Sequence, residues 1–166
     1  MSLPVKELVF TCYQPEYGLE TVKMWRRSFQ QALGIEQHNR LEELTDHLAH
    51  FKTFDPKSIQ IALNTKTSEV VGLKTQEGQE LHHLFIHVDY QGQGIGSRFI
   101  NEAKNQSPSG INLYTFVLNP GAQRFYQHHG FQEVERGFAN PEDNPWANNK
   151  QQLADIKYHW SPNPEQ

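Results

Sequence analysis

The feature that most constrains this chain is a glycine-rich turn at residues 91–96, which follows an apolar strand pattern and opens a helical pattern. We expect the strand from Leu81 to Val88, and the helix carries Ile95, Phe99 and Ala103 on one stripe. Successive glycines remove the side chains that would block a ligand, and the unpaired N–H groups of the first helical turn face it. The pattern therefore predicts an anion site, and pyrophosphate fits such a site.

Two common phosphate motifs do not match this turn. A P-loop ends in Gly-Lys-Ser/Thr, whereas Gly96 is followed by Ser97 and Arg98, so no lysine reaches a terminal phosphate. A dinucleotide fingerprint needs a third glycine, where Ser97 stands, and an acid at the end of the next strand, which is absent from the strand expected at 111–117. Taken alone, the glycines are equally compatible with a tight strand-to-helix connection.

The rest of the chain alternates strand and helix patterns without an internal repeat or a long linker. Apolar residues at both parities of 81–88 indicate that both faces of the sheet are covered. We expect an α/β sheet with helices on both faces. The expected strands are 5–13, 59–63, 70–74, 111–117, 131–136 and 153–160; the expected helices are 19–33, ended by Gly34, 41–51 and 120–129; a long connection is expected at 137–152, and a frayed tail at 161–166.

The composition excludes several classes of protein. A net charge of -4 over 166 residues gives no general attraction to nucleic acid. Cys12 is the only cysteine, so no intramolecular disulfide or cysteine-based zinc site forms, and His47 and His50 lack a third ligand for a metal. No cationic leader and no apolar run of ~18 residues is present, so we expect a cytoplasmic protein outside the membrane.

A resemblance makes the anion site more specific. The stretch from Leu84 to Gly96 resembles the acetyl-CoA signature of the GNAT (GCN5-related) N-acetyltransferase superfamily, with its Gln/Arg-x-x-Gly-x-Gly/Ala loop. Val88 stands where many relatives have proline, and residues 1–75 agree with the family in pattern only. A second family pattern, Asn-x-x-Ala-x-x-Phe-Tyr-x-x-x-Gly-Phe, is matched one strand downstream by Asn119, Ala122, Phe125, Tyr126, Gly130 and Phe131.

The resemblance implies one three-layer α/β (α+β) N-acetyltransferase domain over residues 1–166, with a mixed, mostly antiparallel sheet of about six to seven strands and an acetyl-CoA core at about 80–131. Acetyl-CoA is then the cosubstrate, and no metal is expected. Asn119 either binds the pantetheine arm or caps the helix at Pro120, and both roles are compatible. The implied cofactor-binding residues are Phe85, Ile86 and Val88 for the pantetheine backbone contacts, Gln91, Gly92, Gln93, Gly94, Ile95, Gly96 and Ser97 for the pyrophosphate, and Asn119, Ala122 and Phe125.

The resemblance also implies the catalytic groups. Tyr126 stands where family members use a tyrosine to protonate the CoA sulfur, and the alternative is a packed ring whose hydroxyl has a routine partner. Glu80 and His82, two apart on a strand, are candidates for the base, with exposed polar roles or a reaction without a dedicated base as alternatives. His83 and His87 are expected to point to the other face.

The sequence constrains the acetyl acceptor less than any other part of the expected function. By resemblance, the cleft lies around residues 25–37 and 137–152, where Trp146 either lines an aromatic wall or packs at a homodimer contact. The expected function is acetyl transfer from acetyl-CoA to the primary amine of a small molecule by direct attack through a tetrahedral intermediate. A non-catalytic CoA sensor and a protein-lysine or N-terminal acetyltransferase are the alternatives, and neither nucleic acid nor membrane is expected as a partner.

Overall fold

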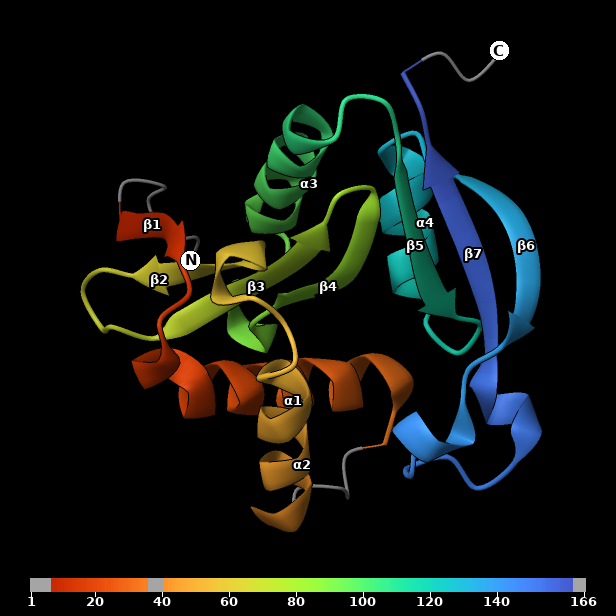
Figure 1. Ribbon diagram of the computed structural model, residues 1–166, viewed down its shortest axis with the longest axis horizontal. Helices are drawn as coiled ribbons and strands as arrows, with labels where there is room; N and C mark the ends of the chain where they lie inside the picture. The colour runs from red at the N-terminus through yellow and green to blue at the C-terminus, as the bar shows by residue number, and fades with distance from the viewer. Residues whose placement is uncertain (1–6, 36–40, 163–166) are drawn as a thin grey trace.

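The computed structural model describes residues 7–35 and 41–162, which form one seven-stranded sheet in the order β1-β2-β3-β4-β5-β7-β6 (Figure 1). The expected mixed α/β sheet is confirmed, while the strand start at 5–6 and the tail at 163–166 lie outside the described residues. The strands are β1 (Leu8–Cys12), β2 (Ile59–Asn64), β3 (Val70–Glu77), β4 (Glu80–Ile86), β5 (Ile111–Phe116), β6 (Gln132–Phe138) and β7 (Ala154–Trp160), and the helices are α1 (Gly18–Leu33), α2 (Leu41–Phe51), α3 (Ile95–Gln106) and α4 (Pro120–His128).

Helices cover the sheet from both sides, as the sequence predicts. Val22 of α1 and Phe51 of α2 pack with Ile61 of β2 on one face. Ala62, the next residue of β2, packs with Phe99 of α3 on the opposite face, because neighbouring side chains of a strand alternate. A further cluster joins α3 and α4 to β5 and β7. The predicted end of α1 is also confirmed, since Gly34 caps it with a φ of 71°.

The sheet is divided between β4 and β5. These two strands are parallel and are paired only at Glu80 and Asn112, whereas the other neighbours form antiparallel ladders. Beyond that single pair, β4 and β5 diverge along their length (Figure 1). The sheet therefore opens in its centre, near residues contributed by both halves of the chain.

Asn112 holds the closed end of this opening. Its backbone N–H donates to Gln79 O at 2.7 Å, and its side-chain Nδ2 donates to Glu80 Oε1 at 3.1 Å. Its Oδ1 lies 2.8 Å from Nδ1 of His159 on β7. One side chain thus connects β4, β5 and β7 where the opening begins.

We expect Asn112→Ala to lower the free energy of unfolding by about 1 kcal/mol, because two side-chain hydrogen bonds are lost and their partners remain partly solvated. Urea denaturation measures the change. Asn105→Ala, which removes the same amide from an exposed position of α3, is the matched control and should alter stability by less than about 0.5 kcal/mol. Equal effects of the two substitutions would contradict a role for Asn112 in joining the strands.

Candidate active site

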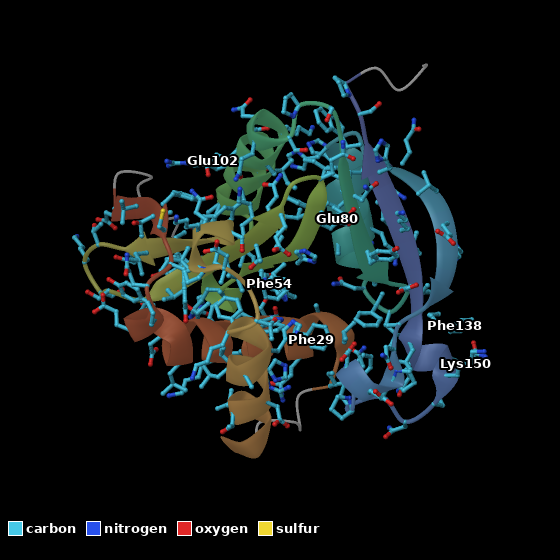
Figure 2. The ribbon with its side chains drawn as sticks, viewed as in Figure 1. Phe29, Phe54, Glu80, Glu102, Phe138 and Lys150 are labelled. Carbon is cyan, nitrogen blue, oxygen red and sulfur yellow. The ribbon has the colours of Figure 1, made fainter. Side chains whose placement is uncertain are left out.

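A cleft of about 500 Å³ occupies the opening between β4 and β5. In Figure 2, Glu80 marks the closed end of the opening, and Phe29 of α1 lies toward its wide end. Because the cleft passes between the two strands, it is reached by side chains from both faces of the sheet. The lining residues are Trp25, Arg26 and Phe29 from α1, Asp46, His47 and His50 from α2, 81–85 from β4, 113–116 from β5, Asn119, Ala122 and Tyr126 from the start and body of α4, and 142–146 from the connection before β7.

Tyr126 supplies a neutral hydroxyl to this cleft from the α4 side. Its side chain is 8% exposed, and its ring packs against Phe125 and Phe131 with centroid separations of 5.2 and 5.4 Å. Burial raises the pKa of the Tyr126 phenol well above its ordinary value of 10.0, because the charged form loses its solvation. None of the described residues forms a hydrogen bond with the hydroxyl, so it remains available as a proton donor.

Asn119 fixes the start of α4 beside the cleft. Its Oδ1 accepts a hydrogen bond from Ala122 N at 3.1 Å, and Pro120 occupies the first turn. The predicted capping role of Asn119 is therefore confirmed. Asn119 and Ala122 both line the cleft, and their contact with pantetheine stays a prediction.

The glycine-rich turn lies just beyond the end of β4. Gly92 and Gly94 have φ values of 77° and 88°, a left-handed conformation that glycine adopts without steric cost. Gly94 is the N-cap of α3, so the N–H groups of the first turn that follows it have no partners within the helix. A Cβ on Gly96 would lie 3.1 Å from Cζ of Phe125, which shows how closely this turn approaches α4.

Two side-chain contacts connect the turn to its surroundings. Gln91 Nε2 donates to Ile86 O at 3.1 Å, which ties the turn to the last residue of β4. Ser97 Oγ lies 3.1 Å from Nε2 of His129 at the end of α4. The turn and the α4 wall of the cleft are therefore held as one unit.

The edge of β4 that faces the opening lacks a neighbouring strand over most of its length. On its other edge, Phe85 and Ile86 pair with β3. Toward β5, pairing stops at Glu80. Backbone groups of an unpaired strand edge can bind an extended ligand as an added strand, so this edge fits the pantetheine contact predicted for Phe85 and Ile86, whereas Val88 lies past the strand in a short 3-10 helix.

A β-bulge separates the two predicted base candidates. The register of β3 against β4 shifts between Thr75 and Gln76, opposite His82, and interrupts the regular alternation that the sequence interpretation assumed. His82 lines the cleft, and its Nε2 lies 2.9 Å from Glu77 Oε1. Glu80 is exposed outside the cleft lining and bonds Asn112 instead.

His83 also lines the cleft, so the expectation that it points away from the site is wrong. The cleft passes between β4 and β5, so side chains from both faces of β4 line it, and residues 81–85 all do so. His83 is 7% exposed, and its ring lies 4.8 Å from Trp25 and 5.7 Å from His50, centroid to centroid. Burial, with a smaller contribution from His50, lowers the pKa of His83 to about 3. His87 lies outside the cleft and caps the short helix after β4.

Aromatic side chains close the wide end of the cleft. Trp146 is 7% exposed and packs against Phe29 and Phe116, with ring centroids 5.8 and 5.4 Å away. Its Nε1 donates to Asn144 Oδ1 at 3.1 Å. The predicted position of Trp146 in a cleft wall is confirmed, and its burial arises within one chain. Three exposed carboxylates also line the cleft, from Asp46, Glu142 and Asp143.

Residues 59–133 match the family described as acetyltransferase (GNAT) domain. The range runs from β2 to the start of β6 and contains the cleft strands, the glycine-rich turn and α4. The matched part of the chain belongs to the GNAT superfamily of N-acetyltransferases.

Named relatives agree with this assignment. An uncharacterized N-acetyltransferase of Methanocaldococcus jannaschii is 34% identical over 70 residues, which are 40% of this chain and only 31% of that protein. The peptidyl-lysine N-acetyltransferase YjaB of Salmonella typhimurium is 28% identical over 121 residues, or 73% of this chain and 81% of the relative.

Solved structures share the GNAT fold. Apo-form YjaB from Escherichia coli matches with a TM-score of 0.69 and 21% identity, over 92% of this chain and 97% of that one. PaiA N-acetyltransferase from Thermoplasma acidophilum, in complex with coenzyme A, matches with a TM-score of 0.62 and 14% identity, over 93% and 98% of the two chains.

Over 7–35 and 41–162, no group of three or more His, Cys, Asp or Glu side chains is arranged to hold a metal ion. Among the same described residues, no helix has the length and apolar character needed to cross a membrane.

The buried His83 predicts a specific pH dependence of stability. Its folded pKa of about 3 lies below the ordinary 6.5, so the unfolded chain takes up a proton first as the pH falls. The contribution of the neutral, buried His83 to the free energy of unfolding is therefore fully present above pH 6.5 and is lost as the pH falls from 6.5 toward 3.

His83→Phe should reduce this loss of stability, whereas His128→Phe at an exposed position should not. Urea unfolding at a series of pH values provides the measurement. An NMR titration in which the His83 ring protonates near pH 6.5 would contradict the buried, neutral state.

Proposed function

We propose that this chain transfers an acetyl group from acetyl-CoA to the primary amine of a small molecule. The observation that carries the proposal is a cleft that passes through the sheet and joins the Tyr126 hydroxyl on one side to an aromatic, histidine-lined chamber on the other. Such a cleft lets the thioester and the amine approach from opposite faces and meet between β4 and β5.

The residues around the glycine-rich turn fit the pyrophosphate of acetyl-CoA. Gly92 and Gly94 leave the approach free of side chains, and the first-turn amides of α3 with the helix dipole favour negative charge. From there, the unpaired edge of β4 at Phe85 and Ile86 leads toward the cleft and suits a pantetheine arm. Coenzyme A in the PaiA structure supports this choice of ligand.

The proposed chemistry uses one acid and one base. The amine nitrogen attacks the thioester carbonyl, the carbon–sulfur bond breaks, and the departing thiolate takes the proton of the Tyr126 hydroxyl, which solvent later replaces. His82 takes the proton that leaves the amine, directly or through water, and the Glu77 carboxylate 2.9 Å away stabilises the resulting imidazolium. Glu80 has no part in this scheme because it does not line the cleft.

The acceptor end of the cleft favours a small cationic amine. Exposed Asp46, Glu142 and Asp143 attract positive charge at the lining, while the connection that carries Trp146 closes one side of the chamber. The main alternative is a peptidyl-lysine acceptor, which the name of the relative YjaB favours. Rates of thiol release from acetyl-CoA with a library of small amines and with lysine peptides test the choice, and a higher kcat/KM for the peptides would reverse it.

Gly94→Ala should raise the acetyl-CoA Kd about tenfold, because a side chain in the left-handed region costs about 1–2 kcal/mol and shifts the turn from its phosphate-binding conformation. Isothermal titration measures the affinity. Gly78→Ala is the matched control, since Gly78 has a φ of 57° in the turn between β3 and β4 and an equally open surrounding. An unchanged Kd for Gly94→Ala, or equal losses for both variants, would argue against pyrophosphate at the turn.

Tyr126→Phe should lower kcat by about a hundredfold, as expected for loss of a general acid, and leave acetyl-CoA affinity nearly unchanged. Tyr17→Phe, which removes a hydroxyl outside the cleft lining, should keep full activity. Steady-state kinetics with the best amine from the library and titration with acetyl-CoA give the two quantities. Full activity of Tyr126→Phe would exclude this tyrosine as the acid, and acetyl-CoA binding without turnover for any amine or peptide would favour a CoA-binding sensor.

A further inference from the structure

His83 is a buried polar side chain in the cleft that the proposed chemistry does not use. It is 7% exposed, and its Nδ1 is shielded from solvent without a hydrogen-bond partner. None of the described residues forms a hydrogen bond with either of its ring nitrogens. Buried polar groups are almost always paired, so an unpaired imidazole in a substrate-sized cleft indicates a partner supplied by a ligand.

Its neighbours define the kind of ligand. The rings of Trp25, Phe54 and Phe85 lie 4.8, 5.4 and 6.4 Å from the His83 ring, centroid to centroid. Across the cleft, Thr115 Oγ1 on β5 is a second buried polar atom without a partner. The chamber thus offers flat apolar walls with a few polar atoms, which suits an amine on an alkyl or arylalkyl carbon chain.

We infer that His83 is the residue that binds the acceptor amine, accepting a hydrogen bond from its N–H and holding the nitrogen toward the thioester. The inference rests on the proposed acetyl transfer and adds the residue and the acceptor class, an alkyl or arylalkyl primary amine. A neutral imidazole has one acceptor nitrogen, which matches the N–H of a neutral amine.

His83 and His82 therefore have different tasks. The depressed pKa of His83 keeps its imidazole neutral near physiological pH, so it accepts a hydrogen bond but is a poor base. His82 is partly exposed, pairs with Glu77 and can pass a proton to solvent. A metal at the His50–His83 pair is not supported, since the described residues contain no suitable ligand group.

The test uses 2-phenylethylamine as the acceptor probe, with thiol release from acetyl-CoA as the readout. His83→Phe keeps a flat ring and removes the nitrogens, and it should raise the KM for the amine about tenfold while the KM for acetyl-CoA stays the same. His83→Asn, whose amide oxygen can stand near the former Nδ1, should recover most of the loss. His128→Phe and His128→Asn at an exposed site are the matched controls and should match the wild type.

Several results would overturn the inference. These are an unchanged amine KM in His83→Phe, an equal loss in the Phe and Asn variants, a parallel rise in the KM for acetyl-CoA, and no turnover of 2-phenylethylamine by the wild type while other amines react. Absence of turnover with every amine and peptide would instead defeat the proposed function itself and the inference with it.

A second measurement needs no variant. In the wild-type protein with bound CoA, 2-phenylethylamine should shift the His83 ring nitrogen resonances with saturation and leave those of His128 unchanged. Resonances of His83 that do not move at saturating amine would contradict the contact even if the variants failed to fold.

Discussion

β4 and β5 run parallel and pair at one position only, Glu80 with Asn112. The rest of the site depends on the opening that this leaves between the two strands. A fully paired sheet would be impermeable, and its two faces would form separate surfaces. Here the strands diverge from a closed end held by Asn112, so that α4 on one side and α1 with α2 on the other contribute side chains to the same cleft. The opening also leaves the β4 edge unpaired next to the glycine-rich turn.

Two local features of the backbone, Gly96 and the β-bulge of β4, shape the surroundings of the opening. Gly96 lets the first turn of α3 approach Phe125, which brings the first-turn amides of α3 close to the α4 wall. At the bulge of β4, the neighbouring His82 and His83 both line the cleft. One of these, His82, pairs with a carboxylate near solvent, and the other, His83, is buried among aromatic rings. Two neighbouring histidines thus have very different surroundings.

The sequence could predict those parts of the site that local rules determine. The glycine-rich turn, the Asn119 cap and the end of α1 at Gly34 each follow from the residue types at one place in the chain. The bulge could not be predicted, because it depends on how β3 and β4 register against each other, and it leaves His82 without a partner on β3, next to the paired His83. The sequence also could not predict that Glu80 accepts a hydrogen bond at the closed end of the opening, since its partner Asn112 lies on a different strand. For Trp146, the sequence could not distinguish a cleft wall from a dimer contact, because the answer depends on its contacts with α1 and β5.

We propose that acetyl-CoA enters the opening between β4 and β5 from the α4 side and meets the amine there. The most direct measurement is a crystal structure of the chain with bound CoA. We expect pyrophosphate oxygens on the amides of the turn at 92–97, pantetheine hydrogen-bonded to the free edge of β4, and the sulfur within hydrogen-bond reach of the Tyr126 hydroxyl. A CoA molecule bound away from the opening, or a sulfur remote from Tyr126 with the cleft left empty, would contradict it.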